Sequence, residues 1–559
     1  MYCLDNFVKR GECVLHPGFN IPGRQLANWL GLRTLLLRWR PVLAVILLVV
    51  IVICIYRHAY LDYARRDHIV FIAERNSFPG TGDWFTHAMN YTRTRISSPG
   101  DYFLFRPGLY FFLTLNDIFL RQNLLVAGIF TILLHLGVVF LLYFTLCRFF
   151  KGSSWPFFFA ALFASQHMGV EMVSWRHIST YMFSASLGLA SLILLSLNER
   201  RKYMWAGFLL FLSMTFHEVQ PAAIALLLTI VLLVHYFKGR PLISGGIIQG
   251  HVICLLSAAL ITYFVLNFFN WLITKPPSFI GPADHFSSVA AFLKESVRNF
   301  VHYLGTATRA VLYPFSMKLS WDKTLDDWAY FTWDMTAGDI RGYLAWGTLG
   351  VILIASAVGI CLRRIWQARE EGAEIITLWA CCGLVSLTLI YSLGRLTLRS
   401  AGYSVTSTYY YWFFSFFYMI ILKFLIDEAL AKLPQSRLRQ GLVYAGGALL
   451  AAMILAQTCM ARDTLKENYD LTWANHIRQA VKTSEVYFTL NPDACLDTDE
   501  SNLGKPPREL QYFTLPYYLN KYNCGWVKGT AVVHLLRTNE GITVIRPGPY
   551  PAEYVEWQP

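Results

Sequence analysis

Charged residues are scarce in this chain of 559 residues. Only 15% of the positions are Asp, Glu, Lys or Arg, whereas 55% are hydrophobic and 16% are aromatic. Soluble domains carry roughly 25% charged residues, so this composition excludes an ordinary soluble protein. The sequence also lacks repeats, a zinc signature, a phosphate-cradling glycine loop and a nucleophile elbow. We therefore expect an integral membrane protein whose site carries none of these signatures.

The few charges that remain are mostly basic. The sequence has 48 Lys and Arg residues against 35 Asp and Glu residues, a formal net charge of +13. In a membrane protein this excess reflects loop orientation and anionic lipid headgroups, and no nucleic-acid-binding motif accompanies it. Residues 1–40 contain no small-residue cleavage site. The apolar run that follows them is therefore predicted to be a retained span.

Eleven apolar runs are long enough to cross about 30 Å of hydrocarbon. The sequence therefore predicts an all-α polytopic membrane protein with about 11 transmembrane helices. The runs occupy residues 41–57, 122–147, 154–169, 178–197, 203–217, 220–237, 247–272, 342–362, 374–393, 408–426 and 441–459.

Basic residues in the loops predict the orientation of these spans. If the N-terminus is cytoplasmic, every loop on that side is short and basic, as the positive-inside rule requires. We therefore expect a multi-pass protein of the plasma, inner or endoplasmic reticulum membrane, with its C-terminus outside. The basic residues of the cytoplasmic loops are Arg148, Lys151, Arg200, Arg201, Lys202, Lys238, Arg240, Arg363, Arg364, Arg369, Lys432, Arg437 and Arg439.

The chain is predicted to have three parts. Residues 1–40 are a cytoplasmic N-terminus, and residues 41–460 are the transmembrane module with outer loops 57–122 and 274–341. Residues 461–559 have soluble composition and strand-like runs, which predicts a small α/β extracytoplasmic domain. Cys495 and Cys524 lie in this domain, where either a disulfide or two free thiols fit the sequence. The strand-like runs are 485–490, 530–536 and 541–545.

The outer loop 57–122 concentrates charges beside an apolar span and is predicted to cap a site at the membrane surface. Asp83 follows a Gly/Pro turn, where it fits either a helix N-cap or a general base. Arg106 is surrounded by aromatic residues, where it either snorkels to lipid headgroups or clamps a phosphate. Other acids of this loop are rivals for the role of base: Asp62, Asp67 and Glu74.

The third and fifth spans are short, and polar residues interrupt each at its outer end, in 167–177 and 215–221. Polar segments at membrane depth are tolerated where they face protein or a water-filled cavity. The two breaks therefore indicate either one shared site or a structural ion-pair network. His135, alone in the second span, fits a core hydrogen-bonding residue or a member of that site. The residues of the breaks are Glu171, Arg176, His177, His217 and Glu218.

A metal site is not predicted from spacing. Asp322, Asp326 and Asp327 fit a divalent-ion site or a solvated acidic turn, and the turn is the simpler interpretation. A divalent cofactor thus stays possible but unassigned.

The order of these motifs resembles the GT-C superfamily of lipid-phosphosugar glycosyltransferases. The similarity is greatest to the protein O-mannosyltransferase-like branch, family 39, and to the related transmembrane mannosyltransferases that act on cadherins. It covers about residues 40–425 and has three departures: Met168 replaces a Pro, His217 replaces a Lys, and the aromatic motif at 408–412 lacks its Arg. The motifs that carry the similarity are Arg106-Pro107, His167 to Glu171 followed by Arg176, and His217-Glu218.

The resemblance implies an enzyme that moves a sugar from a polyprenyl-phosphate-linked donor to an acceptor hydroxyl on a protein or glycan, at the extracytoplasmic face and with inversion. It implies Asp83 as the base and places Arg106 and Arg176 on the donor phosphate. Membrane lipids are the other expected partners. Residues expected to orient the substrate are Glu171, His177, His217, Glu218 and His135, with Glu74, Arg395 and Arg399 as possible further members.

Two other functions fit a polytopic protein of this kind. A transporter or lipid flippase usually shows two similar halves and helices broken near the midplane, and the sequence shows neither halves nor such placement. An O-antigen ligase or polymerase would instead place its basic residues in one late outer loop, near Arg395 and Arg399.

Overall fold

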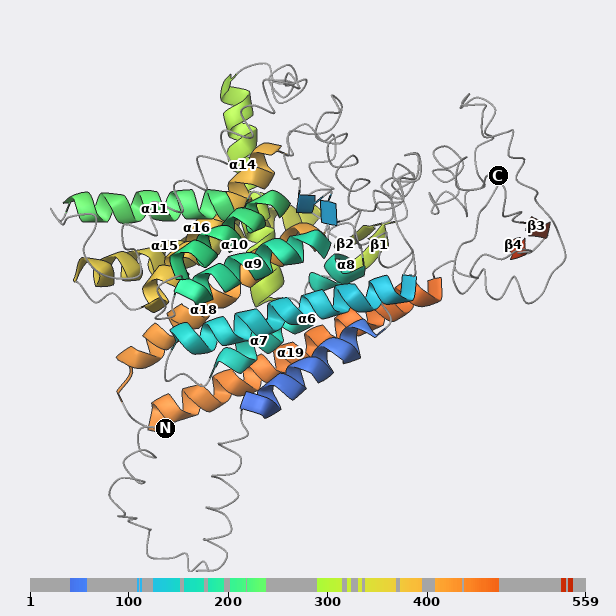
Figure 1. Cartoon of the computed structure of the whole chain (residues 1–559), viewed down its shortest axis with the longest axis horizontal. Coiled ribbons are helices and arrows are strands. Elements are labelled where there is room, and N and C mark those ends of the chain that lie inside the picture. The colour runs from blue at the N-terminus through green and yellow to red at the C-terminus, as the bar shows by residue number, and fades with distance from the viewer. Residues whose placement is uncertain are drawn as a thin grey trace, which may run out of the picture. The chain divides into compact units, whose positions relative to one another are not determined.

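A computed structural model of the chain is almost entirely helical over the residues that it describes. Figure 1 shows the arrangement of its helices. The described residues are 41–57, 108–109, 111–112, 124–150, 155–174, 179–195, 202–217, 219–237, 289–313, 319–322, 330–333, 337–367, 372–394, 408–434, 437–471, 534–538 and 541–545.

Ten of the eleven predicted apolar runs coincide with helices, and the run 247–272 lies outside the described residues. The third run is divided into two helices by a short break. The elements are the helix Pro41–Tyr56, α6 (Leu124–Phe149), α7 (Pro156–Ser165), α8 (Gly169–Ser174), α9 (Thr180–Leu195), α10 (Lys202–Phe216), α11 (Val219–Phe237), α15 (Ala337–Trp366), α16 (Gly372–Gly394), the 3-10 turn η4 (Thr408–Tyr411), α18 (Trp412–Lys432) and α19 (Arg437–Leu471).

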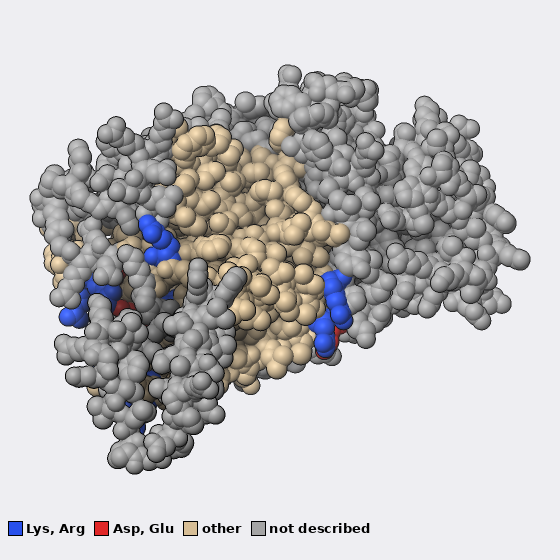
Figure 2. Space-filling view, turned by 60° about the horizontal axis from the view of Figure 1, so that its bottom comes forward, with Lys and Arg blue, Asp and Glu red and all other residues tan. Residues whose placement is uncertain are grey.

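Four described helical segments are long and apolar enough to cross a bilayer by themselves. They are Gly128–Phe149, Gly342–Trp366, Gly372–Ser392 and Arg437–Asp463. Figure 2 shows a broad face of the described residues that is almost free of charge, with Lys and Arg gathered at opposite margins. Such a face suits contact with lipid tails. The described chain is thus an all-α membrane protein.

The helices differ in how far they are buried. About four-fifths of the most apolar stretch of α16 is buried, against about a tenth of that of α19, whose exposed side chains are mostly apolar. The first half of α18, from Trp412 to Ile421, is apolar on every side apart from Ser415 and is buried without interruption. A helix that is apolar all round belongs inside a bundle. Helices α16 and α18 therefore lie at the centre of the bundle, and the polar groups described below lie beside them.

One packed helix lies where the sequence analysis placed only the outer loop 274–341. This helix, α14 (Val289–Leu312), packs against α15, and a Cβ at Gly305 would overlap the Tyr343 carbonyl oxygen. Close approach at small residues is the usual packing of membrane helices. The Thr308 and Tyr418 hydroxyls are hydrogen-bonded at 2.6 Å and join α14 to α18. The second outer loop thus contributes a helix to the core.

Two antiparallel hairpins complete the described elements. Strands β1 (Leu319–Asp322) and β2 (Tyr330–Trp333) pair Leu319 with Trp333, and β3 (His534–Thr538) and β4 (Gly541–Ile545) pair Thr538 with Gly541. The second hairpin matches two of the three strand-like runs predicted for the tail. Asp326, Asp327, Cys495 and Cys524 lie outside the described residues.

Candidate functional site

The polar break in the third apolar run lies deep inside the protein. Helix α7 ends at Ser165, Gln166 takes an extended backbone conformation, and α8 begins at Gly169. All six residues of α8 are buried, and Glu171 in its first turn is only 1% exposed. A helix start is electrostatically favourable for a carboxylate, although burial in an apolar surrounding opposes its charge. The break therefore brings an acid to membrane depth.

His167, inside this break, is anchored to α19. Its backbone N–H and its ring Nδ1 both contact Gln457 Oε1, at 3.1 and 2.7 Å. Because the backbone N–H is a donor, the Gln457 atom must be the oxygen, and Nδ1 must also donate to it. In neutral His167 the Nε2 atom consequently carries the lone pair. A side chain 290 residues away along the chain thus fixes the tautomer.

The helix α19 also shows how deep the break lies. Gln457 precedes Arg462 by five residues, about 8 Å along the helix, and follows Arg439 by about 27 Å. Arg462 and its ion-pair partner Asp463 are both solvent-exposed. The break therefore lies nearer to the Asp463 end of the candidate span Arg437–Asp463 than to its Arg437 end.

Tyr56 and His135 close the break from two other helices. Their rings meet edge to face with centroids 5.0 Å apart, and both side chains are fully buried. A Cβ at Gly169 would overlap the Tyr56 hydroxyl oxygen and lie 3.6 Å from His135 Cε1. Only glycine fits at the start of α8 while Tyr56 holds this position. Tyr56, His135 and Gly169 therefore pack directly against one another.

Several buried polar atoms around the break have no hydrogen-bond partner. Both ring nitrogens of the fully buried His135 are among them. An unpaired buried polar group costs about 1–3 kcal/mol, so a cluster of them is unusual. The atoms are Tyr56 Oη, His135 Nδ1 and Nε2, both amide atoms of Gln166, Ser174 Oγ, Trp412 Nε1 and Gln457 Nε2.

The second predicted break lies between α10 and α11, at His217. The backbone N–H of Val219 donates to His217 Nδ1 at 3.1 Å, so the proton of neutral His217 is on Nε2. His217 and His167 thus hold opposite tautomers. The Tyr181 ring packs edge to face on His217 at 4.6 Å, and the Phe413 ring lies 5.1 Å from His217 and 6.1 Å from Tyr181.

The first residues of α18 join the two breaks. Trp412 lies 6.3 Å from the His135 ring, and the adjacent Phe413 lies 5.1 Å from the His217 ring. The Trp412 and Phe413 rings are themselves 5.2 Å apart. A row of rings therefore runs from Tyr56 through His135, Trp412 and Phe413 to His217. Both breaks share this wall, although three helices and the connection between α10 and α11 supply its residues.

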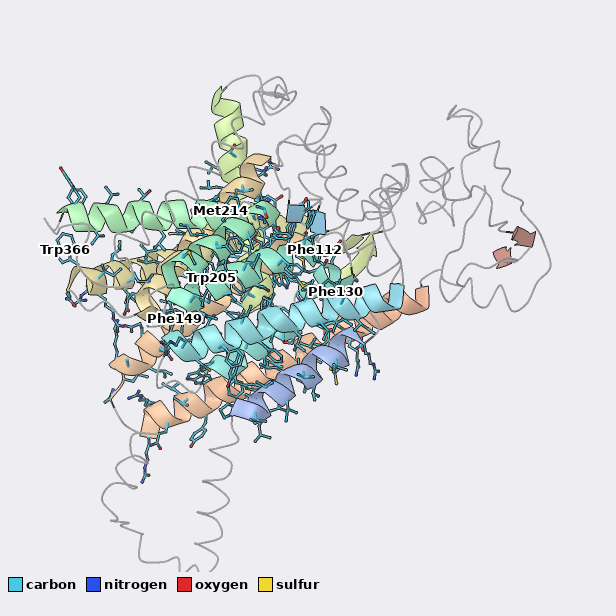
Figure 3. The ribbon with its side chains drawn as sticks, in the orientation of Figure 1. Phe112, Phe130, Phe149, Trp205, Met214 and Trp366 are labelled. Carbon is cyan, nitrogen blue, oxygen red and sulfur yellow. The ribbon has the colours of Figure 1, made fainter. Side chains whose placement is uncertain are left out.

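Part of the outer loop 57–122 also reaches the second break. A Cβ at Gly108 would overlap the Thr215 hydroxyl of α10, two residues before His217. Phe112 packs on Phe183 of α9 at 4.4 Å and stacks on Phe130 of α6 at 6.0 Å. Figure 3 shows Phe112 beside Phe130 near the start of α6. The segment that follows Arg106-Pro107 thus covers the end of α10.

Three predicted site residues are described, namely His135, Glu171 and His217. His135 adjoins the break that carries Glu171, and His217 lies across the Trp412–Phe413 wall. No group of three or more potential metal ligands lies within the described part of the chain. Predicted residues outside it are Glu74, Asp83, Arg106, Arg176, His177, Glu218, Arg395, Arg399, Cys495 and Cys524.

Sequence analysis missed four residues of this site: Tyr56, Gln166, Trp412 and Gln457. Gln457 carries a usable signal, because an uncharged polar residue in the last apolar span needs a partner inside the bundle. Tyr56, the last residue of the first helix, looks like an interfacial aromatic residue in sequence. Its contact with Gly169 depends on chain packing, which one sequence does not disclose.

Comparison with known protein families, with curated proteins and with solved structures finds no match to this chain.

Proposed function

We propose that the protein is a membrane glycosyltransferase that moves a sugar from a polyprenyl-phosphate-linked donor to an acceptor hydroxyl on the extracytoplasmic face. The observation that carries the proposal is the buried break between α7 and α8, where His167 and Glu171 lie among apolar helices. Ionisable residues inside a membrane usually belong to a substrate or proton site. The resemblance of the ordered motifs to GT-C enzymes supplies the reaction class.

In the proposed reaction Asp83 accepts the proton of the acceptor hydroxyl, whose oxygen attacks the anomeric carbon opposite the phosphate. The bond between that carbon and the phosphate oxygen breaks, and its electron pair leaves with the lipid phosphate. The configuration at the anomeric carbon is therefore inverted. Arg106 and Arg176 stabilise the charge that develops on the departing phosphate.

The described side chains supply groups suited to orienting a sugar. Neutral His167 donates through Nδ1 and neutral His217 accepts through Nδ1, so the Nε2 atom is an acceptor in His167 and a donor in His217. Glu171 is a further acceptor for sugar hydroxyls. Trp412 and Phe413 add aromatic surface between the breaks. His135, His177 and Glu218 complete the proposed orienting set.

The proposal includes the full membrane arrangement. The chain crosses the bilayer eleven times, with a cytoplasmic N-terminus and an extracytoplasmic α/β domain at residues 461–559. Its support is the ten helices that match apolar runs and the hairpin β3–β4 in the tail. With this orientation, the break near Arg462 faces the extracytoplasmic side, together with the outer loop 57–122.

The direct test is sugar transfer in native-lipid membranes supplied with labelled polyprenyl-phosphate sugars. Asp83→Asn should lower the transfer rate by about 100-fold or more, the effect of losing a general base. Glu171→Gln, which removes a charge but keeps the size, should lower it by about tenfold. Asp463→Asn is the matched control, since Asp463 is exposed on α19, and should leave the rate unchanged.

Two results would contradict the proposal. Undiminished transfer by Asp83→Asn would remove Asp83 from the mechanism. If the purified wild-type protein transfers no sugar but moves lipids or sugars across proteoliposome membranes, a transporter or lipid flippase replaces the enzyme.

A further inference from the structure

Tyr56 lies at the end of the first helix, yet it determines where the broken helix begins. Its ring stands on His135 of α6, and its hydroxyl oxygen fills the space that a side chain at Gly169 would need. Gly169 is the first residue of α8, which carries Glu171 two residues later. A shift of Tyr56 therefore moves the backbone that presents Glu171.

The hydroxyl of Tyr56 is not needed for a hydrogen bond within the described structure. The side chain is fully buried and Oη has no partner, so the contact with Gly169 is steric. If only the hydroxyl is removed, the nearest Tyr56 atom to a Cβ at Gly169 is Cζ, at 3.4 Å. That distance is an ordinary van der Waals contact, so the clash depends on one atom.

We propose that Tyr56 is a positioning residue, which acts through Gly169 to hold α8 and Glu171 at the depth of the site. The role rests on the proposed function for its catalytic consequence, but the steric coupling between Tyr56 and Gly169 stands without it. Tyr56 touches no reacting atom in this account. It holds in place Glu171, the acid proposed to orient the sugar.

A double-substitution experiment isolates this coupling. Gly169→Ala should displace Tyr56 and the start of α8, while Tyr56→Phe should be well tolerated because it deletes an unpartnered hydroxyl. The double variant Tyr56→Phe/Gly169→Ala should recover the parent position of α8, since the overlapping Tyr56 Oη is absent. Gly137→Ala on α6 is the matched control, because no atom lies within 4 Å of a Cβ there.

The first readout does not depend on activity. Ser174→Cys places a thiol at the end of α8, where the native side chain is 1% exposed. Its reaction with a membrane-permeant maleimide, followed by mass spectrometry of the peptide, should be slow in the parent. Gly169→Ala should accelerate labelling by about tenfold, and the double substitution should return it to the parent rate.

The second readout is sugar transfer by the same variants without Ser174→Cys. The transfer rate should fall about tenfold in Gly169→Ala and recover in the double substitution, with the change in kcat rather than in KM. If the maleimide labelling rate is raised equally in Gly169→Ala and in the double variant, the positioning role is overturned. Unchanged labelling in Gly169→Ala would overturn it as well.

The two readouts separate the two proposals. Rescue of labelling without any transfer by the wild-type protein supports the steric coupling and contradicts the glycosyltransferase. Altered labelling with unaltered transfer overturns the catalytic consequence of positioning. If Gly169→Ala does not accumulate in membranes, accumulation of the double variant supports the coupling, and failure of both contradicts it.

Discussion

Two polar clusters lie at opposite ends of α18, and they differ in how their groups are paired. At one end, Arg364 of α15 donates to Glu374 of α16 at 2.7 Å and pairs with Glu428 of α18. Lys423 pairs with Asp427 and also lies over the Phe150 ring. At the other end, beside Trp412, the polar atoms of the α7–α8 break include many without a partner.

The difference separates a structural cluster from a candidate functional one. Buried charges that hold helices together are expected to be paired, because an isolated buried charge is costly. Polar atoms that are buried without protein partners are places where water, an ion or a substrate can bind. The paired cluster of Arg364, Glu374 and Glu428 is therefore interpreted as a clamp of α15, α16 and α18, and the break as the candidate site.

The largest effect should come from breaking the clamp. Arg364→Met leaves Glu374, which is fully buried, without its guanidinium, and should lower the free energy of unfolding by about 3 kcal/mol. Thermal unfolding in detergent measures the change. Arg462→Met removes a guanidinium from an exposed pair and should have almost no effect. Equal stability of the two variants would show that the clamp is not structural.

The anchor between the break and α19 should give the next largest effect. Gln457→Leu removes the acceptor of two His167 donors and should lower the free energy of unfolding by about 2 kcal/mol. Transfer should fall as well, because the His167 tautomer is no longer fixed. Thr388→Val, which loses only a hydroxyl bond within its own helix, is the control. Full activity in Gln457→Leu would exclude His167 from the site.

A single hydrogen bond in the core should matter less. Tyr418→Phe removes the 2.6 Å bond to Thr308 that joins α14 and α18. The free energy of unfolding should decrease by about 1 kcal/mol, with transfer unchanged, because both residues are away from the breaks. Chemical denaturation together with the transfer assay tests this. A large loss of transfer would show that α14 belongs to the site.

The smallest effect on stability should accompany a clear loss of function. His135→Leu replaces an imidazole whose two ring nitrogens have no partner by an apolar side chain of similar volume, so the free energy of unfolding should change by less than about 1 kcal/mol. Transfer should nevertheless fall, because His135 is proposed to orient the sugar. Unaltered transfer at unaltered stability would make His135 an ordinary core residue.

The hydropathy of the sequence predicted most of the described helices but missed α14. The runs that became α6, α15, α16 and α19 differ from their predicted limits by only a few residues at most ends, because a bilayer demands a long apolar segment. Hydropathy did not detect α14 because this helix carries Lys294, Arg298 and Arg309 and buries a face of small residues. A hydropathy scale does not register a pattern of small residues that packs helices together.

The site was predictable only where polarity contrasts with the surrounding sequence. His135, Glu171 and His217 stand out because acids and imidazoles are rare in apolar runs. Gln457 stands out only as an uncharged polar residue in the last apolar span, and its partner, like the role of Trp412, depends on which helices are neighbours. The pairing of Gln457 with His167 joins residues from the third and the last predicted spans. Such contacts follow from the packing of the bundle, which the order of motifs leaves open.

The most direct test of the account is photo-crosslinking with a polyprenyl-phosphate sugar that carries a photoreactive group on the sugar. Mass spectrometry of the wild-type protein in membranes should place the label on residues 166–174, and unlabelled lipid-linked sugar should compete it away. Label confined to the lipid-facing residues of α15 and α19, unaffected by competitor, would contradict the assignment of the break as the sugar site.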